Sequence, residues 1–311
     1  MRTRAADLDA LLVGARGGRA LDVGRLLSLV ENRSPDVPAL MRVLAPLTGN
    51  ATVVGVTGPP GVGKSTTTSA LVTALRARGG TVAVVAVDPS SPFSGGALLG
   101  DRVRMAEHAT DPGVFIRSVA SRGHLGGLAA TTPQAIRVLD AVGYDTVIVE
   151  TVGVGQSEVE VAASADTTLV LVAPGMGDGI QAAKAGILEV ADVLVVNKAD
   201  LDGADATVRE LRRALAQRAP GEWDPPVVRT VASAGTGIDD VVDAIDERSA
   251  WLRSSGRLGE RRAVRARSEL RALVADAVLG RIDDRRLADL AEQVASAELD
   301  VYAAVTLLLG D

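Results

Sequence analysis

The chain has 311 residues, of which 47% are hydrophobic and only 2% aromatic, and its net charge at pH 7 is −6. Length and hydrophobic content suffice for one large domain, whereas the charge and the scarcity of aromatic rings argue against a nucleic-acid binder or a protein of anionic membrane surfaces. Cysteine is absent, which excludes disulfides and thiolate metal sites, and two histidines disfavour a zinc enzyme. We expect a cytoplasmic protein without a membrane span, because the N-terminus lacks a secretory pattern and no run approaches about 20 apolar residues.

The first 49 residues are predicted to form amphipathic helices. Apolar residues recur at helical spacing in three groups, which begin at Leu8, Leu26 and Leu40. We therefore interpret residues 1–49 as an N-terminal helical extension whose apolar faces pack against a core.

Residues 50–255 alternate short apolar runs with helical stretches. The runs predict strands at 52–56, 81–88, 114–120, 145–150, 166–174, 192–197 and 226–232. The predicted helices occupy 65–78, 131–142, 177–190, 204–218 and 237–254. Strands and helices that alternate in this way form a mostly parallel sheet with helices on both faces, so the fold class is α/β. Ligands of such sheets bind at the carboxyl ends of the strands, where the motifs described next also fall.

The first strand leads into a glycine-rich loop with the pattern G-x-x-x-x-G-K-S. Its residues are Gly58, Pro59, Pro60, Gly61, Val62, Gly63, Lys64 and Ser65, and the predicted nucleotide-binding stretch extends to Thr66. A strand, this loop and a helix make a P-loop, whose backbone N–H groups and helix N-terminus bind phosphate oxygens. Lys64 is expected to reach the β- and γ-phosphates, and the Ser65 hydroxyl is expected to ligate Mg²⁺.

Two later motifs indicate that the base is guanine. Asn197, Lys198 and Asp200 form an N-K-x-D sequence after the sixth predicted strand, where the Asp200 carboxylate could accept hydrogen bonds from the base N1–H and its exocyclic amine. The alternative role of Asp200 is to cap the following helix. Ser233 and Ala234 follow the last strand, where a short loop of GTPases offers a backbone N–H to the guanine O6.

Three acidic residues are candidates for binding Mg²⁺ or for catalysis. Glu150 ends a strand and is followed by Gly153, so the carboxylate could hold Mg²⁺ or orient the attacking water, and the Gly153 N–H could contact the γ-phosphate. Asp88 ends the second strand, and Asp101 lies on the loop that follows, where a switch loop would contact Mg²⁺ and nucleotide. Asp101 could equally cap a helix that starts at the next residue.

A further glycine-rich stretch, at 175–186, carries Gln181 and Lys184 near its start and is a candidate mobile segment at the nucleotide edge. The tail, residues 256–311, is again predicted to be helical, and its apolar stripes could cap the core or form a subunit interface. Six arginines between positions 257 and 271 crowd its start. We interpret them as a solvated helix face, because glutamates interleave with them.

The sequence is similar to the MeaB/ArgK group of P-loop GTPases over roughly residues 19–240. The stretches that carry the resemblance are the P-loop, VAVDPSSPFSGGALLGDRVRM, VIVETVGVGQSE and PGMGDGIQAAKAGILEVADVLVVNKAD. The combination of ETVGVGQSE, DPSS and GGALLGDRVRM is specific to this group, whereas a P-loop by itself is not.

The resemblance implies a GTPase that binds GTP or GDP with Mg²⁺ and acts as a chaperone of adenosylcobalamin-dependent acyl-CoA mutases, chiefly methylmalonyl-CoA mutase. It implies that Asp88, Asp101 and Glu150 form the acidic Mg²⁺ and catalytic set beside Lys64 and Ser65. It further implies that the loop around Gln181 and Lys184 is an additional switch that responds to the partner, and that the C-terminal helices, residues 256–311, form the arm of a homodimer.

Two other functions fit the sequence less well. A nickel-delivery GTPase usually carries cysteine or clustered histidine, but here there is no cysteine, and His108 and His124 lie sixteen positions apart. An ATP-driven partitioning or targeting protein often has a second lysine after the first P-loop glycine, where this chain has Pro59, and the N-K-x-D motif also opposes ATP.

Overall fold

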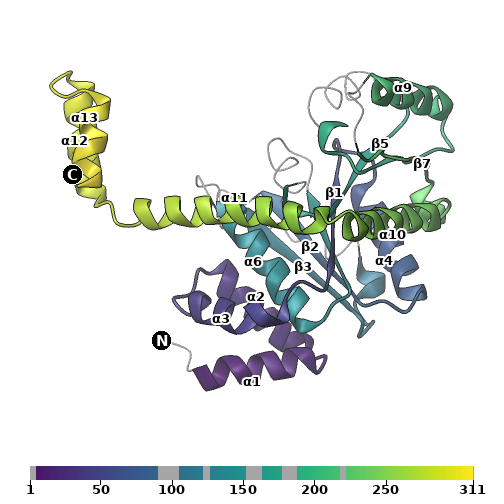
Figure 1. Cartoon of the computed structure of the whole chain (residues 1–311), viewed down its shortest axis with the longest axis horizontal. Coiled ribbons are helices and arrows are strands. Elements are labelled where there is room, and N and C mark those ends of the chain that lie inside the picture. Colours follow the sequence, from purple (N-terminus) through teal and green to yellow (C-terminus); the bar gives the residue numbers. More distant parts are fainter. Residues whose placement is uncertain are drawn as a thin grey trace.

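The computed structural model describes residues 5–89, 105–121, 127–151, 163–176, 188–217 and 222–310. Its centre is a seven-stranded sheet in the order β3-β2-β4-β1-β5-β6-β7, in which all neighbouring strands run parallel (Figure 1). The strands are β1 (Thr52–Thr57), β2 (Val82–Pro89), β3 (Val114–Ser121), β4 (Thr146–Thr151), β5 (Thr167–Val172), β6 (Val193–Val196) and β7 (Val227–Arg229). The predicted parallel α/β fold is confirmed.

Helices cover both faces of the sheet. Successive residues of a strand point to opposite faces, so each strand contributes side chains to the core on either side. Val54 and Val56 of β1 pack in one core with α4 (Lys64–Ala77) and α10 (Ile238–Ser254). Val53 points to the other face, which is covered by α6 (Gly127–Val142) and, over β5 and β6, by α9 (Ala204–Ala216). The valine-rich strands that the sequence predicted are buried for this reason.

The N-terminal helices extend the second of these cores. They are α1 (Ala5–Arg16), α2 (Ala20–Glu31) and α3 (Val37–Leu44), followed by the 3-10 turn η1 (Ala45–Leu47). Leu26 and Leu40 are fully buried in the same cluster as Val53. Arg117 of the edge strand β3 pairs with Glu31, so the extension is joined to the sheet by charge as well as by apolar packing.

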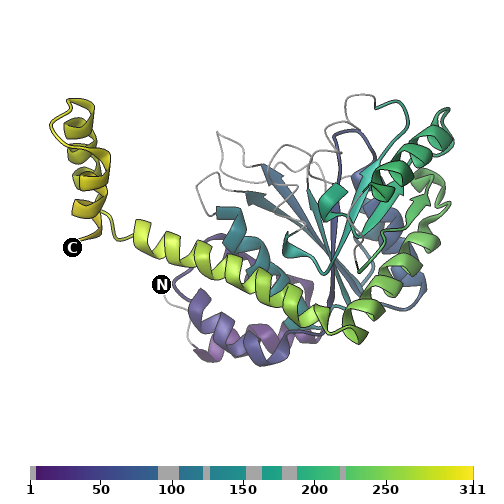
Figure 2. The same ribbon diagram turned by 45° about the horizontal axis from the view of Figure 1, so that its top comes forward.

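The C-terminal helices leave the body of the molecule. The helix α11 (Arg257–Leu279) runs from the end of α10 past α6, and α12 (Asp284–Ala295) and α13 (Val301–Leu309) form a hairpin that stands away from the sheet (Figures 1 and 2). None of the helices in the described part of the chain is long and apolar enough to cross a membrane.

The prediction of a solvated arginine face at the start of α11 is wrong for three of its six arginines. Arg262 and Arg265 pair with Asp166, and Arg261 pairs with Asp192 at 2.7 Å. Asp166 and Asp192 precede β5 and β6 at the amino edge of the sheet and are 2% and 5% exposed. A buried carboxylate needs an ionic or hydrogen-bonding partner, and α11 supplies it.

Three differences between the predicted and the observed element boundaries are larger than two residues. The helix expected at 131–142 begins earlier, at Gly127, and the strand expected at 226–232 is confined to Val227–Arg229. The latter is short because the chain turns into the 3-10 helix η5 (Ala232–Ala234). Of the helix expected at 177–190, only the last three residues are described, and they form the 3-10 helix η4 (Leu188–Val190).

Candidate nucleotide-binding site

The P-loop packs so closely at two of its glycines that no side chain could replace them. Gly58 has φ 145° and Gly63 has φ 93°, both in the region that side chains disfavour. A Cβ atom on Gly58 would lie 2.3 Å from the Leu171 carbonyl oxygen, and one on Gly63 would lie 2.5 Å from the Asn197 amide nitrogen. The glycines therefore allow the loop to pack directly against β5 and against the end of β6.

Lys64 and Ser65 begin α4, directly after the loop. The buried Lys64 ammonium donates hydrogen bonds to the carbonyl oxygens of Gly58, at 2.7 Å, and Pro59, at 3.1 Å. The Ser65 hydroxyl donates to Glu150 Oε1 at 2.6 Å. Glu150 reaches this place because β4 pairs with β1, with Glu150 opposite Val56. The structure thus brings Ser65 and Glu150 together, and their hydroxyl and carboxylate oxygens are ligands that fit Mg²⁺.

Asn197 joins three parts of the site. Its amide nitrogen donates to the Val62 carbonyl oxygen of the P-loop at 2.8 Å, and its oxygen accepts from the Thr230 hydroxyl and the Ala232 N–H, both at 3.1 Å. The residue is 3% exposed, so these bonds are made in the absence of competing water. The N-K-x-D motif predicted that Asn197 reads the base. It did not predict the hydrogen bonds by which Asn197 joins the P-loop to Thr230 and Ala232.

Lys198, Asp200 and Ser233 surround a smaller cavity of about 260 Å³ next to Gly63. Lys198 has φ 57°, and its ammonium donates to the Gly61 carbonyl oxygen at 2.8 Å. The Ala234 N–H donates to the carbonyl oxygen of Val231, directly before η5, so within this turn the Ser233 N–H is the amide better placed for a ligand in the cavity. The N-K-x-D motif and the Ser-Ala loop therefore meet on one side of the P-loop.

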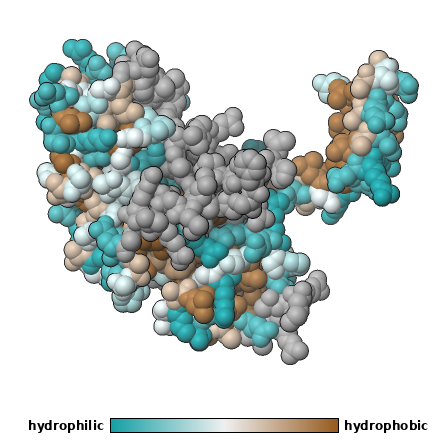
Figure 3. Space-filling model, turned by 180° about the vertical axis from the view of Figure 1, so that it is seen from behind, coloured by the Kyte–Doolittle hydropathy of each residue, from teal (hydrophilic) through white to brown (hydrophobic). Residues whose placement is uncertain are grey.

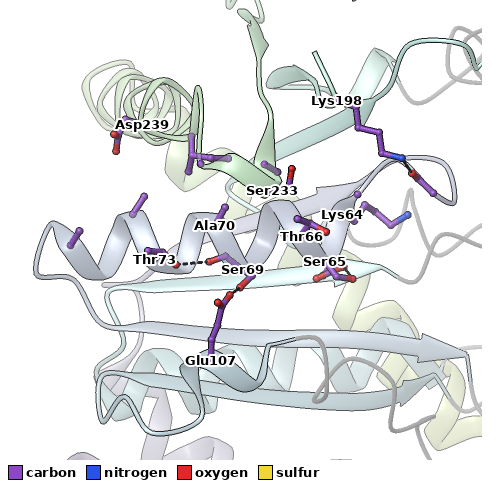
Figure 4. A pocket seen from close by; sticks show the side chains of 18 of the residues that line it. Lys64, Ser65, Thr66, Ser69, Ala70, Thr73, Glu107, Lys198, Ser233 and Asp239 are labelled. Carbon is purple, nitrogen blue, oxygen red and sulfur yellow. Dashed lines mark hydrogen bonds between the residues drawn. The ribbon is translucent and has the colours of Figure 1, made fainter. Parts of the chain in front are cut away.

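These parts open into a cavity of about 1090 Å³ that continues along α4 (Figure 4). Its lining includes Ser69 and Glu107, which the sequence analysis did not single out. Ser69 could have been found, because it lies one helical turn after Ser65 and therefore on the same face of α4. Glu107 carried no such signal, because it reaches the cavity only through the fold of the chain between β2 and β3.

Several predicted site residues cannot be placed. Asp101, Gly153, Gln181 and Lys184 lie outside the described residues. Asp88 is described by its backbone alone, which lies near the carboxyl end of β2 opposite Ala120. Among the described residues, no group of three or more histidine, aspartate or glutamate side chains gathers as a ready-made metal site. Mg²⁺ in nucleotide sites usually needs only one or two carboxylates, with phosphates and water completing its shell.

Comparisons with known proteins agree with this geometry. The family model described as "Methylmalonyl Co-A mutase-associated GTPase MeaB" matches residues 23–286. A relative from Pyrococcus abyssi is 46% identical over 310 residues and covers 97% of this chain and 96% of its own. GTPase ArgK of Escherichia coli is 41% identical over 276 residues, with 86% of this chain and 83% of ArgK covered. The mouse methylmalonic aciduria type A homolog is 37% identical over 294 residues, with 88% and 70% covered.

A solved structure shows the same fold. The crystal structure of an LAO/AO transport system kinase superposes with a TM-score of 0.73 and 32% identity, and the match covers 99% of this chain and 98% of that one. The fold is α/β, the P-loop is joined to the strand that carries N-K-x-D, and the family match extends along most of the sequence. The chain therefore belongs to the MeaB family of methylmalonyl-CoA mutase-associated GTPases.

Proposed function

We propose that this protein hydrolyses GTP to GDP and phosphate in a Mg²⁺-dependent reaction, and that it uses this cycle as a chaperone of an adenosylcobalamin-dependent acyl-CoA mutase, chiefly methylmalonyl-CoA mutase. The observation that carries the GTPase part is the bracing of the P-loop by Asn197, which fixes the phosphate-binding loop beside Asp200 and Ser233. A nucleotide whose phosphates lie on the loop then has its base beside the guanine-reading motif.

On the phosphate side, the loop N–H groups and the N-terminus of α4 bind the phosphate oxygens. The Lys64 ammonium exchanges the carbonyl oxygens of Gly58 and Pro59 for the β- and γ-phosphates, and Ser65 and Glu150 hold the metal ion. When bound, Mg²⁺ would supply neutralisation of the phosphate charge. Glu150 either contacts the metal or orients the water that attacks the γ-phosphate.

On the base side, the Asp200 carboxylate accepts hydrogen bonds from the two guanine donors, and the Ser233 N–H donates to O6. Adenine presents an amine where guanine has O6 and lacks the N1 hydrogen, so it would leave these groups unpaired. A site built on such pairs rejects the wrong base strongly. The stem of Lys198 covers the base while its ammonium stays on the loop.

The remaining roles rest on the family resemblance and on sequence position. Asp88 and Asp101 complete the acidic set around Mg²⁺, and the Gly153 N–H contacts the γ-phosphate. Gln181 and Lys184 belong to a segment that responds to the mutase. Through that segment, binding of the mutase would change the rate of hydrolysis.

The C-terminal arm, residues 256–311, is proposed to form a homodimer. Its helices expose large apolar side chains, which would remain in contact with water in a monomer. Monomeric soluble proteins rarely expose large apolar patches. These residues are Leu270, Val274, Leu279, Leu287, Val301, Tyr302, Val305 and Leu309. Figure 3 shows hydrophobic surface on the hairpin along the side that faces the body of the molecule. In a homodimer, the arm of a second copy of the chain would cover this surface.

The test is phosphate release from GTP and from ATP, each measured with and without purified methylmalonyl-CoA mutase. We expect slow turnover of GTP alone, little turnover of ATP, and acceleration of GTP turnover by the mutase. Turnover of ATP at the same rate as GTP would exclude the assignment of Asp200 and Ser233 as guanine-reading residues. GTP turnover that no cobalamin-dependent mutase changes would leave a GTPase with a different client.

A nickel-delivery GTPase remains the second candidate, and it makes a different prediction. That function needs soft or imidazole ligands, but the chain has no cysteine and only two histidines, of which His108 is buried beside α4. Equilibrium dialysis with nickel should therefore show no tight binding, and tight binding would favour this alternative.

A further inference from the structure

The strand β3 lies at the edge of the sheet, and half of its main-chain groups point away from its neighbour β2. In a parallel pair, alternate residues of a strand bond to the neighbour with both their N–H and their C=O groups. The Val82 N–H of β2 donates to the Gly113 carbonyl oxygen at 2.9 Å, so the odd-numbered residues of β3 bond to β2. The N–H and C=O groups of Ile116 and Ser118 therefore point outward. Among the described residues, no main-chain group bonds to them.

A cavity of about 730 Å³ lies along β3 and has two walls. One wall is α2, which presents Ala20, Gly24 and Ser28, and the other is the segment 105–109, which includes Met105. The helix α2 packs in the core on one face of the sheet and Met105 packs in the core on the other face, so the walls flank the plane of the sheet. We call this cavity the edge groove. It occupies the place that an eighth strand would take.

The wall formed by α2 is fixed to β3 through Arg117. Arg117 Nη1 donates to the Gly24 carbonyl oxygen and Nη2 donates to the Ser28 hydroxyl, both at 2.9 Å. Arg117 Nε donates to Glu31 at 2.7 Å, so all three nitrogens of this guanidinium are engaged. Ala20, Gly24 and Ser28 are spaced by four residues and share one face of α2. Their short side chains leave room for the side chains of an added strand.

Arg25 lines the same groove and offers a cation to an incoming group. Its side chain is 59% exposed, and its Nη1 lies 3.5 Å from Asp22 Oδ1. Arg19 approaches the other oxygen of Asp22 more closely, at 2.8 Å. Arg25 can therefore leave its long contact for a carboxylate of a ligand, and a charge-assisted hydrogen bond of normal length is the stronger one. Among the described residues that line the groove, none is acidic.

We propose that the edge groove binds an extended segment of a partner protein, which adds a strand beside β3 and places a carboxylate against Arg25. Outward N–H and C=O groups that alternate along an edge are matched by a second extended backbone, whereas the main-chain groups of a helix are already paired within the helix. Side chains of the added strand would face α2 and Met105 in turn. Because the walls are small or apolar there, small apolar side chains suit both directions.

The edge of β3 also lacks the features by which proteins prevent strand addition. Edge strands are commonly protected by proline, by bulges or by charged side chains. The stretch from Val114 to Ser118 contains no proline and pairs with β2 in unbroken register. Its one charged side chain, Arg117, is held on α2. The edge groove shares no lining residue with the two cavities of the nucleotide site, so this inference does not depend on the proposed GTPase activity.

The first measurement is amide hydrogen exchange of the full chain, resolved by residue. In the free protein, the amides of Ile116 and Ser118 should exchange at least about tenfold faster than those of Phe115 and Arg117, which are bonded to β2. Equal protection of the four amides would show that the outer side of β3 is already covered, and it would overturn the proposal.

The second measurement selects binders from a displayed library of random peptides longer than the eight residues of β3. Selected peptides should carry a carboxylate among small apolar residues, and they should slow exchange at Ile116 and Ser118. Ile116→Pro and Ser118→Pro each remove one outward N–H and should weaken these peptides by about tenfold or more. Arg229→Pro is the matched control. Arg229 lies on the opposite edge strand, β7, and its N–H also points away from the sheet because Thr230 bonds to β6.

The charge of the groove is tested separately. Arg25→Glu should weaken the selected peptides by about tenfold or more, whereas Arg25→Lys should stay within about threefold of the parent. Arg42→Glu makes the same charge change at an exposed position of α3 and should have no effect. All variants should keep the GDP affinity and the melting temperature of the parent, which separates loss of binding from loss of the fold.

Two further results would overturn the proposal. The first is a selection that yields no peptide weakened by Ile116→Pro or Ser118→Pro in a variant that keeps the parental melting temperature. The second is a set of peptides that bind Arg25→Glu as tightly as they bind the parent, because the carboxylate would then have no role. Absence of GTP hydrolysis would contradict the proposed function and leave these results unaffected.

Discussion

The two edges of the sheet bind their charged groups in different ways. At the amino edge, the buried Asp166 and Asp192 are each paired with two arginines. The four arginines are Arg262 and Arg265 on Asp166 and Arg248 and Arg261 on Asp192. At the carboxyl edge, Lys64 and Lys198 donate to main-chain carbonyls of the P-loop. Each ion pair of the amino edge neutralises a buried carboxylate, so the amino edge is built to stay fixed. The lysines of the carboxyl edge donate to neutral carbonyl oxygens, which a negatively charged phosphate oxygen can replace, so that edge is built to exchange its partners.

Aromatic rings reinforce the fixed edge. The Arg248 guanidinium lies 4.9 Å from the ring centroid of Trp223 and 4.5 Å from that of Trp251, while the Trp223 indole N–H donates to the Asp192 carbonyl oxygen at 2.8 Å. Burial lowers the pKa of Arg248, and the neighbouring Asp192 opposes that shift. The guanidinium stays charged in any case. Charge and hydrogen bonding therefore join α10 and the segment before β7 to Asp192 at the start of β6, and cation–π contact joins them to each other.

Removal of one buried carboxylate should have the largest effect. Asp192→Ala leaves Arg248 as a buried cation without its partner, and we expect it to lower the free energy of unfolding by about 3–5 kcal/mol, measured by urea denaturation. Asp205→Ala is the matched control, because Asp205 and its partner Arg229 are both exposed and such pairs contribute at most about 1 kcal/mol. Equal losses in the two variants would contradict a fixed amino edge.

The second prediction concerns the exchangeable edge. Lys64→Ala removes the ammonium that is proposed to contact the β- and γ-phosphates, so GTP turnover should fall by at least about a hundredfold, measured as phosphate release. Arg212→Ala, an exposed position on α9, should leave turnover unchanged. Substantial turnover in Lys64→Ala would refute the assignment of the P-loop.

The third prediction concerns the choice of base. Asp200→Asn presents an amide hydrogen where guanine presents its own donors, so the affinity for GTP should fall by at least about a hundredfold while that for xanthosine triphosphate rises, measured by calorimetry. Asp202→Asn serves as the control, since Asp202 is exposed two residues further on and is not part of the cavity lining. Unchanged GTP affinity would show that Asp200 does not read the base; nor does Asp200 cap α9, whose N-cap position is occupied by Gly203 without a side-chain hydrogen bond.

The smallest of these effects is expected at the arm. Val274→Asp places a charge on an exposed apolar position of α11, so the dissociation constant of the proposed homodimer should rise by about tenfold or more, measured by analytical ultracentrifugation. Arg267→Ala, an exposed position of the same helix, should change it little. A monomeric parent protein would contradict the homodimer.

Much of the carboxyl edge was predictable, because it is built from motifs that are local in sequence. The P-loop reads directly from Gly58 to Ser65, and the approach of Glu150 follows from one rule, that neighbouring parallel strands end at the same edge. The N-K-x-D motif likewise predicted the place of Asp200, beside the P-loop.

The ion pairs of the amino edge and the contacts of Ser69 were not predictable, because they join residues far apart in the sequence. The arginines of α11 appear as a solvated helix face, and only the fold brings Arg261 to Asp192. The sequence pattern also did not predict the hydrogen bond from Asn197 to the Val62 carbonyl oxygen or that from Ser69 to Glu107. Polar residues whose partners come from tertiary structure cannot be assigned from the local pattern alone.

The most direct test of the account is nucleotide turnover with purified methylmalonyl-CoA mutase. We predict that GTP is hydrolysed slowly, that ATP is hydrolysed far less, and that the mutase accelerates GTP hydrolysis. Hydrolysis of ATP and GTP at equal rates, or no hydrolysis of GTP in either condition, would contradict the central claim that the carboxyl edge is a guanine-specific catalytic site.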